Sequence, residues 1–420
     1  MTKKVFSINT PKKLGSANSV PKSWTQVQVA PTGIMAKDAD DFLFAWGSSG
    51  YANTTIFGGA GPASSPTSGN NVFNLDSTEL QPVPHQALGL PNAQAIKKLI
   101  FAGHGNDQTA YAITQDGDLY ASGFNTYGVG GGRGGGPNFG DSTYNLNDVK
   151  QARSSFTQIF SGQRGVEHPE HTQLIDKGVH DIDSNRYAVG MIKNDGTLHT
   201  WGYNHLGQLG ANSTQILYSP VQIGNERYRK VLMGMHDDQN STMALRDDHT
   251  LYMWGSNEYG QLGITHGHTT WHTIDRSSPN QVTSGTGSFI HISSSGKHSA
   301  AIDSENRLYM WGYNNYGQLG VGNIANRSSP TQVPGSWSQV ETGYDTTYAL
   351  TTDNQLFAWG RKHVGSIPEH PFNANRSSPI ALKGNNNNTG ANVSFGLVSW
   401  TNIAAIDYGG IAVEATTNTA

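Results

Sequence analysis

The chain has no cysteine and few charged residues. Disulfide bonds and thiolate metal sites are therefore excluded, and stability must come from packing and backbone pairing. Charged residues make up 14% of the 420 residues, against roughly 25% in ordinary soluble domains, and the formal net charge is −4. Because no long basic or acidic run occurs, attraction to nucleic acid or to an anionic membrane has little support.

Long hydrophobic runs are missing as well. No apolar stretch approaches the roughly 18 residues of a membrane span, so we expect no membrane insertion. The first residues include lysines at positions 3, 4, 12 and 13 but no apolar signal core. We therefore expect synthesis in the cytoplasm, and the final location stays open.

What the chain does have is an internal repeat. The phrases WGYNHLGQLG, WGSNEYGQLG and WGYNNYGQLG begin at Trp201, Trp254 and Trp311, which lie 53 and 57 residues apart. A period of this size indicates an array of small structural units. Weaker copies are centred on Trp46, Ser122 and Trp359.

A second signal precedes each phrase. It is an aromatic or apolar residue followed three positions later by an aliphatic one, and in the tightest units it lies 22 residues before the WG tryptophan, as from Phe289 to Trp311. Alternating, β-rich segments and turns such as Asp195-Gly196 indicate strands and hairpins between the two signals. The second signal occurs seven times, at Trp24/Val27, Ile96/Leu99, Phe156/Ile159, Tyr228/Val231, Phe289/Ile292, Trp337/Val340 and Trp400/Ile403.

Seven copies of one signal against six of the other indicate an incomplete last unit. The segment after Trp400 is too short for a final WG strand, whereas Val5–Asn9 has strand-like composition. We therefore predict an all-β, seven-bladed β-propeller closed by pairing of the N-terminal strand with the C-terminal blade. Within a single domain, 1–420, the expected blades are 23–95, 96–154, 155–227, 228–287, 288–335, 336–398, and 399–420 plus 1–22.

Most tryptophans fall on these two signals, which indicates packing anchors between blades. The glycines that end each phrase allow tight turns. The predicted structural anchors are Trp46, Trp201, Trp254, Trp311, Trp359, Gly210, Gly263 and Gly320.

The WGxNxxGQLG phrase, the Asp-Gly turn before it and the proline some ten residues after it resemble the regulator of chromosome condensation repeat, a family of seven-bladed propellers. The resemblance covers essentially the whole chain. It implies an architecture but not one function. The founding member is a nucleotide exchange factor for the small GTPase Ran that also docks on chromatin, and other members are ubiquitin-ligase modules, membrane-traffic regulators, bacterial effectors and virion proteins.

Function is expected where units exceed the minimal length, because loops on a rigid scaffold are free to vary. Two insertions stand out, Ser48–Pro84 and Ser161–Asp183, and whether they form an accessory lobe stays open. The candidate binding residues are loop aromatics: Tyr51, Phe57, Phe139, Tyr144 and Trp271.

A metal site has only a weak candidate. His266 and His268 have the spacing that places two imidazoles on one face of a strand, and His272 follows, but no nearby carboxylate completes the set. No Ser-His-Asp or paired-carboxylate arrangement occurs at equivalent repeat positions. We therefore expect no catalytic residues, no enzyme activity and no cofactor.

The leading functional hypothesis is a non-catalytic structural or binding propeller within a larger assembly. The uncharged Asn/Gly/Ser/Thr-rich composition favours a bacteriophage virion protein: a decoration, a tail component or a host-recognition appendage. Its partners would be other proteins of the assembly, or a host surface receptor or glycan, and not nucleic acid. The alternatives are a guanine nucleotide exchange factor or regulator of a small GTPase, with the Ser161–Asp183 insertion as its wedge, and a glycan-binding adhesin.

Overall fold

The structure is a computed structural model, and the regular elements that it describes are all strands. The predicted all-β class is confirmed. Within the described part of the chain, no helix has the length and hydrophobicity of a membrane span. The described residues are 4–7, 24–30, 33–38, 43–47, 83–84, 96–104, 107–114, 117–123, 153–160, 178–185, 187–234, 240–264, 274–283, 287–361, 375–382, 398–406 and 410–417.

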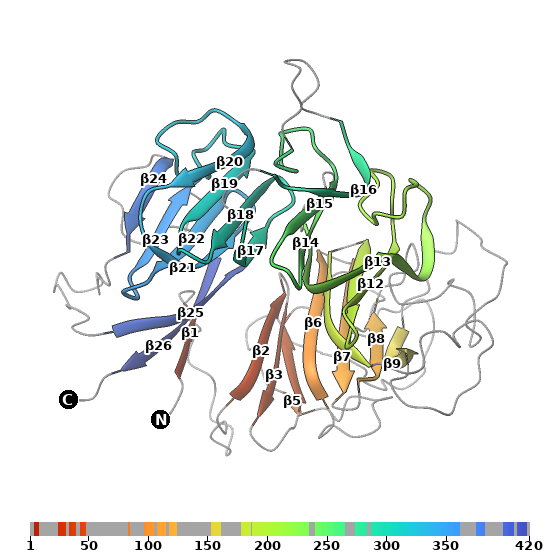
Figure 1. The fold of residues 1–420 in the computed structure, drawn as a ribbon. Helices are drawn as coiled ribbons and strands as arrows, with labels where there is room; N and C mark the ends of the chain where they lie inside the picture. Colours follow the sequence, from red (N-terminus) through yellow and green to blue (C-terminus); the bar gives the residue numbers. More distant parts are fainter. Residues whose placement is uncertain are drawn as a thin grey trace. The chain divides into compact units, whose positions relative to one another are not determined.

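The recurring unit is an antiparallel sheet of four sequential strands (Figure 1). It is complete in β17 (Phe289–Ser294), β18 (His298–Asp303), β19 (Leu308–Gly312) and β20 (Arg327–Val333), which pair in that order. The same order holds in three further sheets: β2 (Trp24–Ala30), β3 (Gly33–Asp38), β4 (Leu43–Gly47) and β5 (Val83–Pro84); β6 (Ile96–His104), β7 (Asp107–Thr114), β8 (Leu119–Gly123) and β9 (Arg153–Phe160); and β21 (Trp337–Thr342), β22 (Thr346–Thr351), β23 (Leu356–Gly360) and β24 (Arg376–Ala381).

The middle of the chain follows the same sequential pairing. Its strands are β10 (Val179–Ser184), β11 (Ala188–Lys193), β12 (Thr197–Gly202) and β13 (Leu217–Met233), then β14 (Ser241–Arg246), β15 (Leu251–Gly255) and β16 (Arg276–Gln281). β13 has 17 residues because it serves twice. Its first half pairs with β12, and its end packs through Val231 and Met233 over Gly190 of β11.

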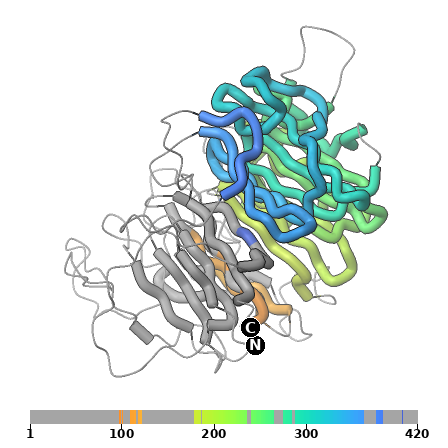
Figure 2. The backbone as a smooth tube through the Cα atoms, turned by 90° about the vertical axis from the view of Figure 1, so that its left-hand side faces the viewer, coloured from red at the N-terminus to blue at the C-terminus, as the bar shows by residue number. Residues whose placement is uncertain are grey.

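The chain divides into two compact units. One comprises Met1–Pro11, Leu206–Gln208 and Gly234–Ala420, and the other comprises Lys12–His205 and Leu209–Met233. Neighbouring sheets in each unit meet through their first strands. In the first unit β21 packs against β17 and β18, and β25 (Val398–Ile406) packs against β21 and β22; in the second, β6 packs against both β2 and β10. In Figure 2 the chain can be followed as it runs back and forth through the antiparallel strands of residues 287–361.

The two ends of the chain share one sheet. β1 (Lys4–Ser7) pairs antiparallel with β26 (Gly410–Thr417), which pairs in turn with β25 (Val398–Ile406). Lys4 lies opposite Ala415 and Ser7 opposite Ala412. The counting of repeats predicts this strand pairing, which supplies a third strand to a sheet that the C-terminal segment alone would leave with two.

The expected start of the third blade at residue 155 differs from the structure. Phe156 and Ile159 lie in β9, which pairs with β8 as the last strand of the preceding sheet. The first strand of the third sheet is β10, where Val179, Ile182 and Trp201 reproduce both the three-residue step and the 22-residue spacing. The expected insertion Ser161–Asp183 therefore ends earlier, since Asp183 is already within a strand. Phe156 and Ile159 are misleading because the last strand of a sheet can carry the same apolar pair as the first strand.

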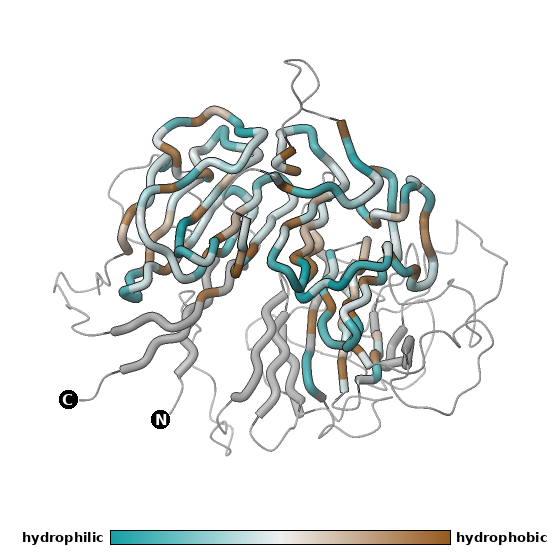
Figure 3. The backbone as a smooth tube through the Cα atoms, viewed as in Figure 1, coloured by the Kyte–Doolittle hydropathy of each residue, from teal (hydrophilic) through white to brown (hydrophobic). Residues whose placement is uncertain are grey.

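The core lies between adjacent sheets. Trp201, Trp254, Trp311 and Trp359 are all fully buried. One cluster joins Ile302 and Met310 of the β17–β20 sheet to Trp337, Val340 and Trp359 of the next sheet. Figure 3 shows hydrophobic residues in short stretches within the strands, separated by hydrophilic turns. A sheet of this kind buries its apolar side chains only when its neighbour is present.

Replacing Gly320 by alanine tests this packing. Gly320 has φ +70°, and an added Cβ would lie 2.7 Å from Nε1 of the buried Trp359 ring. We expect Gly320→Ala to lower the free energy of unfolding by about 2–4 kcal/mol, because left-handed strain and a clash combine. The control is Gly322→Ala, where φ is +81° but no atom lies within 4 Å, so only about 1 kcal/mol of backbone strain is expected. Equal losses in denaturant titrations would contradict the packing argument.

Candidate functional site

The repeated phrase is explained by one bifurcated acceptor. The backbone carbonyl of Gln318 accepts hydrogen bonds from the Trp359 indole Nε1 and the Thr347 hydroxyl, both at 2.8 Å, and both donors belong to the following sheet. The same pair of bonds recurs twice more. Gln261 accepts from Trp311 and Ser299, and Gln208 accepts from Trp254 and Thr242. A buried indole N–H needs a hydrogen-bond partner, and here that partner belongs to the preceding repeat. We call this pair of hydrogen bonds, from an indole and a hydroxyl of one repeat to a Gln carbonyl of the repeat before it, the latch.

The other polar letters of the phrase shape its loop. In WGYNNYGQLG, the Asn314 side chain accepts from Leu319 N–H at 3.0 Å and donates to the carbonyls of Asn323 and Ala325 at 2.9 Å. The Gln318 side chain accepts from Tyr316 N–H at 3.0 Å. Asn204 and Gln208 make the equivalent bonds in the repeat that begins at Trp201. These residues hold the loop, so the remaining positions of the phrase are free to carry function.

One such position directly follows each WG pair. Its backbone N–H donates to the carbonyl of the residue just before the second strand: Tyr313 to Lys297 at 3.0 Å and Arg361 to Asp345 at 2.8 Å. The register His298↔Gly312 places these residues together at one end of the two central strands of the sheet. The backbone arrangement is constant, whereas the side chains change from repeat to repeat. The four pairs are Tyr203/Tyr187, Ser256/Asn240, Tyr313/Lys297 and Arg361/Asp345.

In the unit that contains residues 234–420, a group of aromatic and cationic side chains lies at this end of the strands. The Lys297 ammonium lies 6.0 Å from the Tyr259 ring centroid, 5.7 Å from Tyr313 and 5.4 Å from Tyr344. These distances are within the range of cation–π attraction. Burial is the main cause that raises the pKa of the Tyr313 phenol, which therefore stays neutral and able to donate a hydrogen bond.

A second cation continues the group. The Arg361 guanidinium lies 4.4 Å from the Tyr316 centroid, and its Nη1 donates to Asp345 Oδ2 at 3.0 Å. The Tyr316 ring packs edge-on against the Tyr313 ring, with 6.1 Å between the ring centroids. The Asp345 side chain is 3% exposed and the Arg361 side chain 37% exposed, so the guanidinium faces solvent over a buried carboxylate. We call Tyr259, Lys297, Tyr313, Tyr316, Tyr344 and Arg361 the tyrosine–cation cluster.

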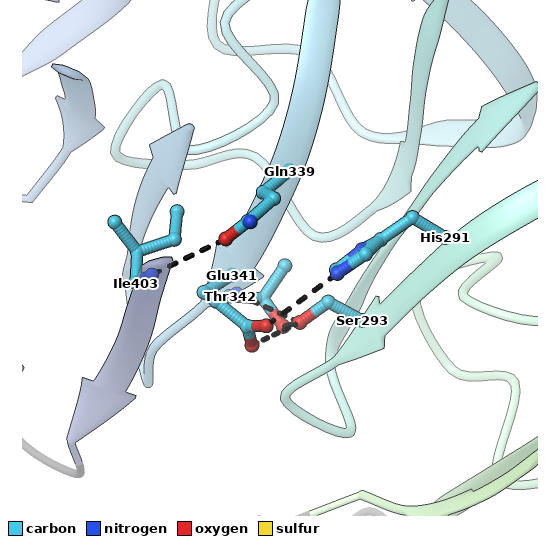
Figure 4. Close-up of polar contacts among 6 residues, drawn as sticks. All are labelled: His291, Ser293, Gln339, Glu341, Thr342 and Ile403. Carbon is cyan, nitrogen blue, oxygen red and sulfur yellow. Dashed lines mark hydrogen bonds and ion pairs between the residues drawn. The ribbon is translucent and has the colours of Figure 1, made fainter. Parts of the chain in front are cut away.

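A different polar group joins the first strands of neighbouring sheets (Figure 4). Ser293 Oγ of β17 accepts from Thr342 N–H of β21 at 2.9 Å and donates to Glu341 Oε2 at 3.2 Å. His291 Nε2 lies 3.9 Å from Glu341 Oε1, so the carboxylate stands between the histidine and the serine. Imidazole must contact the hydroxyl to act as its general base, and this arrangement does not provide that contact. The group is a bridge between strands.

The equivalent position in the other unit holds a carboxylate. Asp183 Oδ2 of β10 accepts from Met233 N–H at 2.7 Å, matching the bond between Ser293 and Thr342. Lys98 of β6 forms an ion pair with Asp181 beside it. Burial raises the pKa of Asp183 to about 6, although the Met233 N–H and the Lys98 charge both act to lower it.

His298 is a structural histidine of the latch region. It is fully buried, with Nδ1 2.9 Å from Ser295 Oγ and Nε2 3.1 Å from Thr347 Oγ1. Because the Thr347 hydroxyl donates to Gln318, it accepts from the ring, which assigns the proton to Nε2. Burial is the first cause that lowers the pKa of His298 to about 3, so the ring stays neutral.

Comparison with protein families identifies these repeats. The model of the regulator of chromosome condensation (RCC1) repeat matches residues 195–233, 248–302 and 305–350, and a second model of the same repeat matches 289–318 and 337–365. The chain belongs to the RCC1-type repeat family. The matched residues include the accepting carbonyl and the indole donor of all three latches, and the hydroxyl donors Ser299 and Thr347 of two of them.

Relatives of this RCC1-type chain differ in function. The ultraviolet-B receptor UVR8 of Arabidopsis thaliana is 34% identical over 146 residues, which are 34% of this chain and 31% of the receptor. The probable E3 ubiquitin-protein ligase HERC4 of Homo sapiens is 33% identical over 144 residues, 34% of this chain and 13% of the ligase. The matched segment thus spans less than a third of either relative.

A solved structure extends the likeness in fold. Prp20p of Saccharomyces cerevisiae, described with its binding to Gsp1p and histones, superposes with a TM-score of 0.66 at 15% identity, covering 94% of this chain and 83% of Prp20p. At this identity the comparison establishes a propeller-type fold of RCC1 repeats and nothing more specific.

The site residues predicted from sequence divide into two groups. The anchors Trp201, Trp254, Trp311 and Trp359 are fully buried between strands, and Gly210, Gly263 and Gly320 have positive φ. Trp46 lies in β4. The binding candidates Tyr51, Phe57, Phe139, Tyr144 and Trp271 and the histidines His266, His268 and His272 lie outside the described residues, as do most of 48–84 and 161–177.

The tyrosine–cation cluster was not predicted from sequence. The sequence marks it only by position: the residue after WG and the residue before the second strand differ between repeats, whereas the neighbouring residues of the motif recur. Among the residues that the structure describes, no group of three His, Asp or Glu side chains is placed to hold a metal ion.

The raised pKa of Asp183 makes stability depend on pH. In the unfolded chain its carboxyl group has the ordinary pKa of 3.8, so between pH 4 and 6 the folded state binds more protons than the unfolded state. Stability should therefore fall across that window as pH rises, by on the order of 2 kcal/mol. Asp183→Asn keeps an acceptor for Met233 N–H and should remove this dependence, as measured by denaturant titrations at several pH values. Identical pH profiles in both proteins would contradict the assignment.

Proposed function

We propose that this RCC1-type chain is a non-catalytic propeller that regulates another protein by binding it through the tyrosine–cation cluster. The cluster itself carries the proposal. Tyrosine and arginine are enriched at the energetic centres of protein interfaces, because they combine large contact area with hydrogen bonding. Here four tyrosines and two cations from consecutive repeats are held on a latched backbone, so little order has to be gained when a partner binds.

The relatives support a regulatory role. Their printed descriptions name an ultraviolet-B receptor, a ubiquitin ligase and a protein that binds Gsp1p and histones. None of them is a virion component, and nothing in the comparisons supports a virion protein or a glycan-binding adhesin. The propeller is better understood as a protein-binding regulator, with the small-GTPase alternative as the specific form to test first.

The GTPase form of the proposal gives a direct experiment. We expect the protein to accelerate release of a fluorescent GDP analogue from a Ran-type GTPase, and to form a complex with it on gel filtration. Tyr313→Ala combined with Tyr316→Ala should weaken the complex by about tenfold, equivalent to about 1.4 kcal/mol.

The matched control is Arg227→Gln, since Arg227 is exposed on β13 in the other unit. Unchanged nucleotide release together with absence of a complex would rule out the GTPase. A complex that survives the double substitution but not the control would rule out this surface.

We further propose that the sheets form a closed ring of seven blades, with β1 completing the last one. The pairing of β1 with β26 supports this arrangement, because a closed ring leaves no exposed strand edge between the first and last blades.

Deletion of residues 1–9 should therefore lower the melting temperature by several degrees and broaden the transition. Attaching the same nine residues after Ala420 through a flexible Gly/Ser linker should restore the melting curve, since the strand would still run antiparallel to β26. A deletion that melts like the full chain would contradict ring closure.

A further inference from the structure

The tyrosine–cation cluster has a chemical bias that goes beyond protein binding in general. Its charged groups are Lys297 and Arg361, both cationic, and the carboxylate of Asp345, which pairs with Arg361, is buried. Glu258, next to Tyr259, is exposed; burial is the main cause that raises the pKa of the nearby Asp275 carboxyl, and the Glu258 charge adds to it. The side chains of the cluster itself therefore present cations and phenols to solvent, and Glu258 is the exposed carboxylate beside them.

Each cation is positioned by aromatic rings. Three tyrosines surround the Lys297 ammonium, and Tyr316 lies under the Arg361 guanidinium at 4.4 Å. Stacking fixes the direction of a flexible cationic side chain and removes part of its water, which strengthens its interaction with an incoming anion. Asp345 engages Nη1 of Arg361, and a guanidinium has five N–H donors in all. Lys297 and Arg361 are therefore held in place to receive carboxylates.

We propose that the partner segment bound here is an acidic, extended peptide whose carboxylates engage Lys297 and Arg361 while its backbone lies across the tyrosines. This inference rests on the proposed function and adds the chemistry of the partner. Nucleic acid fits less well, because its affinity grows with the number of phosphates neutralised, and this cluster supplies two cations. Two cations linked by the Tyr313–Tyr316 contact match a short acidic motif.

The test uses a fluorescein-labelled peptide of alternating glutamate and glycine, and fluorescence anisotropy at low and moderate salt. We expect saturable binding that weakens with salt. Lys297→Gln should raise Kd by about tenfold, equivalent to about 1.4 kcal/mol, whereas Lys297→Arg keeps the charge and should retain binding. Arg361→Gln removes the partner of Asp345, so its melting curve must be measured, and Arg361→Lys serves as the charge-retaining variant.

The controls separate the alternatives. Arg227→Gln removes the same charge from an exposed position on β13 and should leave Kd unchanged. A peptide with glutamine in place of glutamate should not bind. Equal affinity for both peptides, or an equal loss in Arg227→Gln, would overturn the proposal, and tighter binding of a labelled thymidine oligonucleotide would assign the surface to nucleic acid.

The outcomes also distinguish this inference from the proposed function. If the acidic peptide fails while Tyr313→Ala with Tyr316→Ala still loses the protein partner, the surface is a docking site of different chemistry. If the peptide binds through Lys297 but no protein partner depends on the tyrosines, the acidic inference holds and the regulatory role fails.

Discussion

The structure depends on a backbone carbonyl that accepts two hydrogen bonds from the next repeat. Gln318, Gln261 and Gln208 each receive an indole N–H and a hydroxyl, and in each case both donors are buried. A donor that lost this partner would be left unsatisfied in the core, at a cost of about 1–3 kcal/mol. This explains why the QLG letters and the tryptophan recur together although they act on different neighbours: the carbonyl belongs to one repeat and the indole to the next.

The latch has a counterpart on the first strands. Ser293 and Asp183 occupy equivalent positions, and each accepts a backbone N–H from a strand that packs against its own: Thr342 of β21 and Met233 of β13. Hydroxyl and carboxylate make the same bond, but only the carboxylate carries a charge that burial opposes. The contacts between repeats thus combine a latch that is the same in three repeats with a first-strand contact whose accepting side chain varies.

Much of the fold could be predicted from the sequence because the repeated letters are those that make repeated bonds. Trp311 and Gly320 recur for packing reasons, and their spacing located most strands, including the pairing partner of the C-terminal sheet. The third sheet was misplaced because Phe156 and Ile159 imitate an inner strand. The tyrosine–cation cluster could not be predicted, since Lys297 and Tyr313 come together only through strand register and the pair of side chains differs among the four described repeats.

The long strand β13 makes two different contacts with the strands that precede it. Its first half pairs with β12, while Val231 and Met233 near its end pack over Gly190 of β11. Apart from the pairing of β1 with β26, such contacts join sheets that are neighbours along the chain, so the interaction energy is distributed over many interfaces. A backbone cut in a loop between sheets would leave both fragments with complementary halves of one interface. Each fragment would therefore keep one side of an interface that the intact chain forms within itself.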